Sequence, residues 1–180
     1  MAAAAFALPA GAASAAPSTV TQAKAPAVSS APTVSKAAKQ FLKKKNKGIC
    51  VNAHISNVGW QGWRCTQSGW PAFVGTVGES LGIEALSIVT GKGSICAQAH
   101  VQNIGWQKGR CAGKNWPITV GTTGQALRLE ALKLWGSRKI CAQGHVQNIG
   151  WQSWSCSKWK PAFVGTVGQS LRLEALRVKV

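Results

Sequence analysis

Apolar and polar residues alternate in short runs along most of the chain. In residues 95–102 the apolar side chains fall on odd positions and the polar ones on even positions. This period of two predicts a strand with one buried face. Residues 127–134 begin in the same way and change phase at Ala131 and Leu132, which predicts a strand with a bulge or a bend.

A helix is the competing interpretation of residues 127–134, because Leu, Glu, Ala and Lys favour helices. We favour a strand, since the corresponding positions elsewhere hold β-branched Ile83 and Val178 and since Gly82 interrupts one copy. Two more short strands are expected around residues 60–64 and 73–76. The pattern therefore predicts four strands in each unit and about twelve in all.

Three copies of one unit fill residues 48–180, with boundaries at 48–90, 94–135 and 138–180. A unit of this length cannot bury its own apolar face, so we expect the copies to share a core around an axis. The expected fold is all-β, a threefold pseudo-symmetric closed architecture of three four-stranded repeats. A β-trefoil-like form is favoured, with a β-prism as the alternative. An open solenoid is disfavoured because its edges would lack caps.

The N-terminal part has a different composition. Residues 1–16 are rich in Ala and end in small residues of the kind that signal peptidase accepts, so we interpret them as a signal-peptide remnant. The usual basic opening is missing, and we expect the natural start to lie upstream; a disordered tail is the alternative. Pro9 and Gly11 interrupt the apolar run, so no transmembrane segment is expected. Residues 17–47, rich in Ala, Pro and Lys, predict a disordered linker.

Charge and composition narrow the chemistry. The chain has 21 Lys and Arg against four Glu, and it has no Asp. This excludes Asp-based calcium sites and aspartate-dependent catalysis. Glycoside hydrolysis normally needs two nearby carboxylates, and only Glu79 lies outside the repeated Glu position. We therefore expect no enzymatic activity and no cofactor, whereas the net charge of +17 favours anionic partners.

Six cysteines occur as one pair per repeat, each pair 15 residues apart: Cys50 and Cys65, Cys96 and Cys111, and Cys141 and Cys156. Pairing within each repeat is the arrangement that follows the triplication most simply, and disulfides agree with secretion. A zinc site with the repeated His is the alternative. Zinc-knuckle ligands are usually closer in sequence, so we expect no metal.

Two sets of residues are candidates for ligand binding. His54, His100 and His145, together with Gln102 and Gln147, could hydrogen-bond sugar hydroxyls. In the competing interpretations the His residues are structural partners of Glu84, Glu130 and Glu174, or form a threefold metal site.

Tryptophan supplies the second set. The recurring Trp residues are expected mainly in the core: Trp60, Trp106 and Trp151, and Trp70, Trp116 and Trp159. Trp63 and Trp154 are expected at the surface, because Gly109 occupies their position in repeat two, and an exposed indole can stack on a sugar ring as it does on bases.

The strings HVQNIGWQ and GTxGQxLRLEAL, which recur in order with small changes, resemble the clostridial hydrophobic repeat with a conserved Trp, the ChW repeat. The resemblance implies an extracellular or cell-surface module that binds polysaccharides or proteins; the six Cys depart from the usual pattern of the family. We expect a secreted, non-catalytic module that binds polysaccharide or cell-wall glycan. The alternative is charge-driven adhesion to anionic polymers or protein partners, with no specific nucleic-acid binding.

Overall fold

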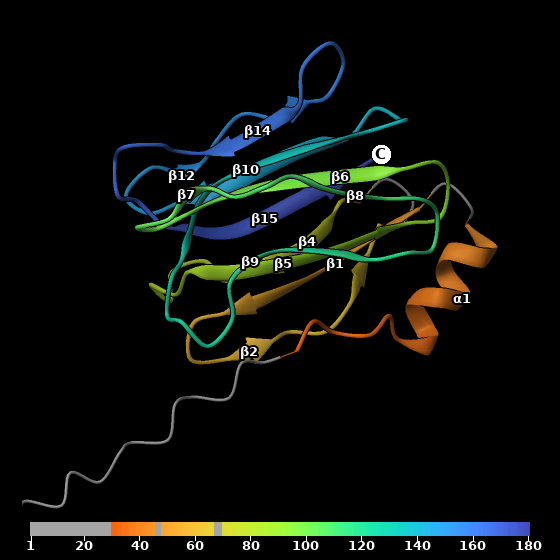
Figure 1. The fold of residues 1–180 in the computed structure, drawn as a ribbon, viewed down its shortest axis with the longest axis horizontal. Coiled ribbons are helices and arrows are strands. Elements are labelled where there is room, and N and C mark those ends of the chain that lie inside the picture. Colours follow the sequence, from red (N-terminus) through yellow and green to blue (C-terminus); the bar gives the residue numbers. More distant parts are fainter. Residues whose placement is uncertain (1–29, 46–47, 67–69) are drawn as a thin grey trace, which may run out of the picture.

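A computed structural model describes residues 30–45, 48–66 and 70–180, which form an all-β protein with one short helix, α1 (Lys36–Lys44) (Figure 1). The expected signal-peptide remnant and the first part of the expected linker lie outside these residues. The strands of the described residues are β1 (Ile49–Ile55), β2 (Gly59–Trp60), β3 (Arg64–Cys65), β4 (Ala72–Gly75), β5 (Ile83–Thr90), β6 (Ile95–Val101), β7 (Gly105–Trp106), β8 (Arg110–Ala112), β9 (Ile118–Gly121), β10 (Leu129–Gly136), β11 (Cys141–Val146), β12 (Gly150–Trp151), β13 (Ser155–Cys156), β14 (Ala162–Gly165) and β15 (Leu173–Lys179).

The two long strands of each repeat pair with each other in antiparallel fashion, as β1 with β5, β6 with β10, and β11 with β15. The expected strand at 95–102 is confirmed as β6. The strand interpretation of 127–134 is also confirmed, and the expected bulge is a register shift between Leu129 and Ala131 in β10. Two very short strands pair in antiparallel fashion with the first long strand, so each repeat has five strands where we expected four.

The fourth strand of each repeat pairs with a strand of another repeat. β9 of repeat two joins β5 of repeat one, β14 of repeat three joins β10 of repeat two, and β4 of repeat one joins β15 of repeat three. Every sheet is therefore completed by a strand from another repeat, and the exchange is cyclic. The described residues form three sheets and no closed barrel, so the all-β triplication is confirmed and the trefoil-like form is not.

One glycine per repeat makes this exchange sterically feasible. Gly75 has φ +98°, and a β-carbon on it would overlap the backbone of Glu174 and Ala175 in the neighbouring strand. The Gln61 side chain holds the glycine from the other side, because its amide accepts from Gly75 N at 2.7 Å and donates to Gly75 O at 3.2 Å. The same clamp recurs between Gln107 and Gly121 and between Gln152 and Gly165.

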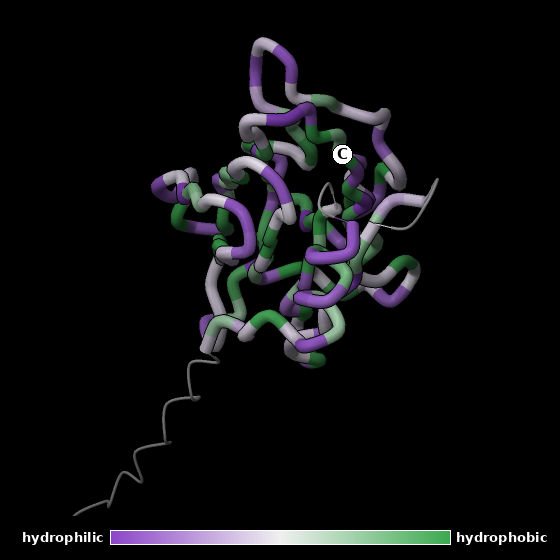
Figure 2. Tube along the Cα trace, turned by 90° about the vertical axis from the view of Figure 1, so that its right-hand side faces the viewer, coloured by the Kyte–Doolittle hydropathy of each residue, from purple (hydrophilic) through white to green (hydrophobic). Residues whose placement is uncertain are grey.

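Aliphatic side chains from all three repeats fill a single core between the sheets. Leu86, Leu132 and Leu176 occupy equivalent positions and are fully buried. Apolar stretches gather in the strands, and hydrophilic stretches lie mainly in the outer turns (Figure 2). Shared burial explains why repeats that cannot close a core individually fold together.

The expectation of a disordered linker fails for residues 36–44, which form α1. Ser35 caps the helix by accepting a hydrogen bond from Ala38 N at 3.2 Å. Ala38 and Leu42 are buried against Cys50 and Val89. Burial of this apolar face stabilises the helix, whereas a polar linker would have no such face to bury.

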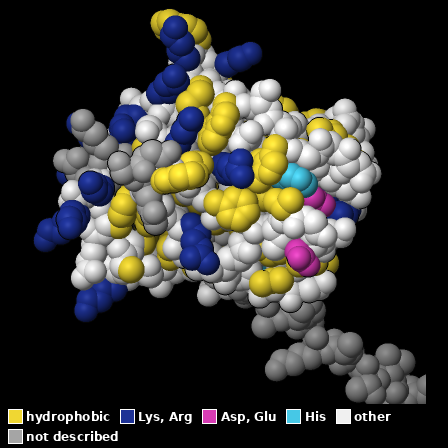
Figure 3. Space-filling model, turned by 180° about the vertical axis from the view of Figure 1, so that it is seen from behind, with side chains coloured by type: hydrophobic (Ala, Val, Ile, Leu, Met, Phe, Trp, Pro, Cys, Tyr) yellow, Lys and Arg dark blue, Asp and Glu magenta, His cyan; other side chains and the backbone are white. Residues whose placement is uncertain are grey.

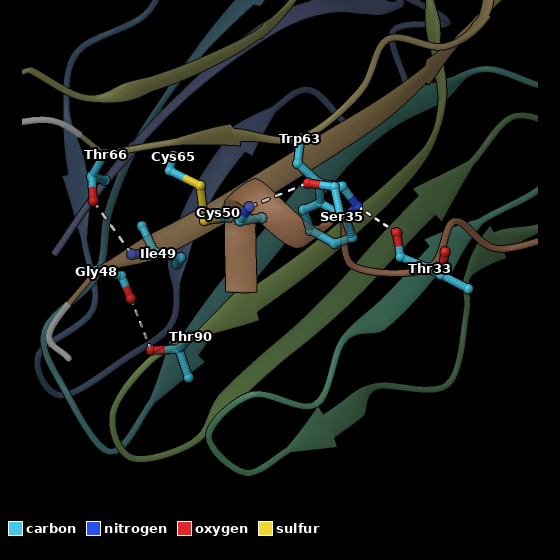
Figure 4. Close-up of a disulfide and its surroundings, with 10 residues drawn as sticks. Thr33, Ser35, Gly48, Ile49, Cys50, Trp63, Cys65, Thr66 and Thr90 are labelled. Atoms are coloured by element: carbon cyan, nitrogen blue, oxygen red, sulfur yellow. Dashed lines mark hydrogen bonds between the residues drawn. A yellow bond between two sulfur atoms is a disulfide. The ribbon is translucent and has the colours of Figure 1, made fainter. Parts of the chain in front are cut away.

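The disulfide pairing within repeats is confirmed as Cys50–Cys65, Cys96–Cys111 and Cys141–Cys156. Each bridge joins the first long strand of a repeat to the third strand, at directly opposed positions. Figure 4 shows the first bridge beside Trp63, whose Nε1 donates to the Thr33 carbonyl at 2.8 Å. The segment of residues 30–45, which we call the N-terminal segment, is thus held next to the first bridge through Trp63.

Candidate functional site: aromatic and cationic rows on the sheets

A row of polar and aromatic side chains crosses the sheet of β11, β15 and β4. Gln143, Arg177 and Phe73 occupy directly paired positions on these three strands. The Arg177 guanidinium lies 4.0 Å from the ring centre of Trp151, and the rings of Trp151 and Phe73 are 6.2 Å apart. We call these four residues the repeat-3 row. It combines an exposed aromatic face with a fixed cation.

An equivalent row lies on the sheet of β6, β10 and β14. It consists of Gln98, Lys133, Phe163 and Trp106, and we call it the repeat-2 row. Lys133 Nζ lies 4.1 Å from the ring centre of Trp106, which is 6.2 Å from the ring of Phe163. Because Phe163 comes from repeat three, the row exists only through the strand exchange.

The sheet of β1, β5 and β9 lacks the cation and the Phe ring of the other two rows. Its row would contain Asn52, Ser87, Thr119 and Trp60, and Thr119 Oγ1 instead donates to Ser87 Oγ at 3.1 Å. Asn52 and Ser87 are 2% and 0% exposed, whereas Gln143 and Arg177 are half-buried. The chain therefore presents two similar rows and one that is closed.

A cleft of about 500 Å³ opens beside the repeat-3 row. It is lined by Trp70, Pro71, Phe73, Trp154 and Arg177. The Trp70 side chain is 73% exposed, and Lys179 Nζ lies 4.2 Å over the ring of Trp154. Figure 3 shows hydrophobic side chains and Lys or Arg side chains side by side on one face of the molecule. Apolar ring faces with a few directional donors are suited to flat, hydroxyl-rich ligands.

The repeated histidines have the acidic partners that the structural interpretation expected. The Nδ1 atoms of His54, His100 and His145 lie 3.0, 3.3 and 3.0 Å from carboxylate oxygens of Glu84, Glu130 and Glu174. Each imidazole also meets a Trp ring edge-on, at centroid distances of 5.2 to 5.3 Å. The side chains are only 12 to 15% exposed, so the rings are largely covered.

The second carboxylate oxygen is satisfied differently in each repeat. Arg172 Nε donates to Glu174 Oε1 at 2.9 Å, and Arg128 lies 3.7 Å from Glu130 Oε1. Repeat one has Gly82 at the arginine position, and there Ser56 Oγ donates to Glu84 Oε1 at 3.1 Å. Glu84 and Glu174 thus accept hydrogen bonds, and Glu130 has the longer ion-pair contacts with His100 and Arg128, which explains the Glu that recurs within an apolar strand.

The remaining sequence candidates are dispersed. Gln102 and Gln147 directly follow β6 and β11, and their backbone N–H groups donate to the carbonyls of Arg128 and Arg172. Trp63 is half-buried beneath the N-terminal segment, whereas Trp154 lines the cleft. The structure therefore brings only one of the proposed binding residues, Trp154, into the cleft.

Two expectations about the tryptophans are wrong. Trp70, Trp116 and Trp159 are 73, 73 and 90% exposed and are not core residues, because each lies in a loop before the exchanged strand. Gly109 does not mark loose packing either: a β-carbon there would lie 3.2 Å from the Trp135 ring, which fills the space that Trp63 and Trp154 occupy in the other repeats.

The sequence interpretation missed Phe73, Phe163, Lys133 and Arg177. The available signal was the cation at the fifth position of LEALK and LEALR, on the polar side of a strand. The phenylalanines could not be assigned to the same place, because they reach it from a different repeat.

Two further observations concern the described residues. None of their helices is long and apolar enough to cross a membrane. They bring together no cluster of three His, Cys, Asp or Glu groups that could hold a metal ion.

The protein is a β-repeat module. Its three repeats exchange strands, and a disulfide links two strands within each repeat. The chain belongs to the ChW family, described as Clostridial hydrophobic W, whose model matches residues 54–90, 100–135 and 145–180, more than half of the chain. No curated protein and no solved structure matches the chain.

Proposed function

We propose that the protein is a secreted or cell-surface, non-catalytic module that binds polysaccharide through the repeat-3 row and its cleft. The observation that carries this proposal is the group of exposed rings, Trp70, Phe73 and Trp154, around the Arg177 guanidinium. The C–H face of a pyranose stacks on such rings. The Arg177 guanidinium, which Gln143 orients by accepting from it at 3.3 Å, has further N–H groups that can donate to hydroxyls.

The repeat-2 row supports the same activity at a second place. It has the same Trp, cation and Phe arrangement, so a repeating polymer can engage both rows of one molecule. Two weak sites on one body raise the overall affinity for a polymer without any new contact. The histidines act in this proposal as supports beneath the Trp rings.

A non-catalytic role is supported by the acidic residues. Three of the four Glu are nearly buried and paired with His, and the fourth, Glu79, lies on an exposed turn. The three disulfides favour an oxidising compartment, which supports secretion. We also propose that the three sheets close around one axis in a prism-like arrangement, which the cyclic exchange of β4, β9 and β14 supports.

The test is retention of the full chain on insoluble chitin, mannan and bacterial cell walls at low and high salt. The double variant Phe73→Thr/Arg177→Ser installs the residues found at these positions in the sheet of β1, β5 and β9, which are Thr119 and Ser87. We expect it to lose about tenfold in affinity for the retained glycan, since it removes one stacking ring and one donor set. Val77→Ser, on an exposed turn, is the matched control and should bind normally. Absence of retention on every glycan, or equal retention of both variants, contradicts the proposal.

Charge-driven adhesion is the second candidate function. It is favoured by 14 Lys and Arg against four Glu in residues 48–180. Binding of this kind falls steeply as salt rises, whereas stacking on the rows persists. Retention measured across a salt series therefore separates the two functions.

A further inference from the structure

The acidic side chains of the long strands lie at one end of the sheets, where Arg128 and Arg172 accompany two of them. Glu84, Glu130 and Glu174 all lie at the start of a long strand, close to the His side chains. The other end of the sheets carries the disulfides, and Lys179 there pairs with Cys141. In Figure 3 the Lys and Arg side chains gather toward the left, and the Glu and His side chains lie to the right.

At the disulfide end, four of the connections between strands carry basic side chains, and the connection from β3 to β4, residues 66–71, carries none. Lys92 lies between β5 and β6, Lys114 between β8 and β9, Lys139 between β10 and β11, and Lys158 and Lys160 between β13 and β14. No Glu lies in these turns. A surface of one sign raises the local concentration of polyanions.

At this end a groove of about 550 Å³ lies between two segments, residues 135–139 and 157–161. Its lining includes Lys139, Lys158, Lys160 and two indoles, Trp135 and Trp159, but no acidic residue. The Trp159 side chain is 90% exposed, and Lys158 Nζ lies 5.4 Å from its ring centre. The groove thus joins a stacking surface to three ammonium groups.

The two segments are fastened to each other. Ile140 N donates to Ser157 Oγ at 2.9 Å, and Ser157 N donates to Ile140 O at 2.7 Å. Lys158 N also donates to the Lys160 carbonyl at 3.3 Å, which closes the loop that carries Trp159. The groove is therefore held in shape by backbone contacts and not only by its lysine side chains.

The lysines of this groove are particular to the junction of repeats two and three. The fastening itself recurs in repeat one, where Ile49 N donates to Thr66 Oγ1 at 3.3 Å and Thr66 N donates to Ile49 O at 2.9 Å, whereas repeat two has Ala112 at this position. The Lys-Trp-Lys sequence at 158–160 has no counterpart in the other repeats. A feature present once in a triplicated fold is not required by the fold.

We propose that this groove is a second ligand site, separate from the sheet rows, that binds an acidic polysaccharide. The carboxylate, sulfate or phosphate groups of the polysaccharide pair with Lys139, Lys158 and Lys160, and one of its sugar rings stacks on Trp159. A glycan is favoured over nucleic acid because the three disulfides favour an oxidising compartment, in line with the secreted module proposed above.

The probes are dextran sulfate and unmodified dextran of the same length, bound to the full chain in a salt series. The groove variant is Lys139→Gln/Lys158→Gln/Lys160→Gln. The charge-matched control, Lys36→Gln/Lys39→Gln/Lys43→Gln, removes three exposed lysines of α1. We expect the groove variant to lose at least fivefold in affinity for dextran sulfate and to show a shallower salt slope, with less than a twofold change in the control. Equal losses overturn the proposal, since net charge alone then explains binding.

Trp159→Ala separates stacking from charge. We expect a loss of about threefold with an unchanged salt slope, because no charge is removed. The Phe73→Thr/Arg177→Ser variant should retain dextran sulfate binding, so that failure of the row site and failure of the groove are distinguishable. Tighter binding of a single-stranded oligonucleotide of equal charge, lost in the groove variant, overturns the glycan assignment. Binding of unmodified dextran as strong as that of dextran sulfate overturns the anionic one.

Discussion

The α-carbon of Gly75 faces the backbone carbonyl of Glu174 so closely that no β-carbon fits between them. The two residues lie in the first and last repeats, on strands β4 and β15. This contact is the point at which the chain closes its cyclic exchange.

Gly75→Ala should destabilise the fold by about 3 kcal/mol, because it adds both a steric overlap and a strained positive φ. Gly78→Ala is the control: its φ is +84°, and nothing lies within 4 Å of the added carbon. The strain alone should cost about 1 kcal/mol there. Urea unfolding followed by Trp fluorescence measures both values. Equal losses would mean that the backbones at β4 and β15 can separate without cost.

Glu174→Gln removes the carboxylate that both His145 and Arg172 contact. We expect a loss of about 2 kcal/mol, since the Arg172 guanidinium, whose side chain is 21% exposed, loses its anionic partner and the His145 ring loses a hydrogen-bond partner. Glu79→Gln, on an exposed turn, should change stability by less than about 0.5 kcal/mol. Thermal unfolding of the two variants at one pH makes the comparison. If Glu174→Gln left the unfolding temperature unchanged, the packing of His145 against Trp151 would be stable without the carboxylate charge.

Leu42→Ala should loosen α1 from repeat one. The side chain is buried in the small cluster with Cys50 and Val89, so its truncation should favour local opening by about 2 kcal/mol. Hydrogen exchange of the α1 amides is the direct measurement, with Lys39→Ala on the exposed face as the control. Exchange that is equally fast in the unmodified chain would show that the helix is not docked.

Replacing Cys96 and Cys111 by Ala should cost about 3 kcal/mol, the chain-entropy value for a loop of this length. The same change at Cys50 and Cys65 should cost more, because both side chains also pack against the N-terminal segment. Denaturant titrations of the two double variants compare them, and a thiol assay on the unmodified protein should find no reactive cysteine. If the two variants lost the same stability, the helix would add nothing to the first bridge.

The strands and disulfides could be predicted from the sequence because they depend on local alternation and on the repeated spacing. The period-two run at 95–102 became β6, and each Cys found the partner in its own repeat. The His and Glu pairs were visible for the same reason.

The rows could not be predicted, since Phe73 meets Arg177 across strands from opposite ends of the chain. Nothing local in the sequence specifies that exchange. The helix was missed because an apolar face of Ala38 and Leu42 is stabilised by tertiary contacts with repeat one and not by its own sequence.

The pairing of β4 with β15 also has a consequence for synthesis. β4 is synthesised early and has no partner strand until β15 has been synthesised. Native topology therefore cannot be completed cotranslationally, one unit at a time. Removal of β15 would leave β4, more than 90 residues earlier in the sequence, without its partner strand, so a change in the last repeat would expose a strand edge in the first one.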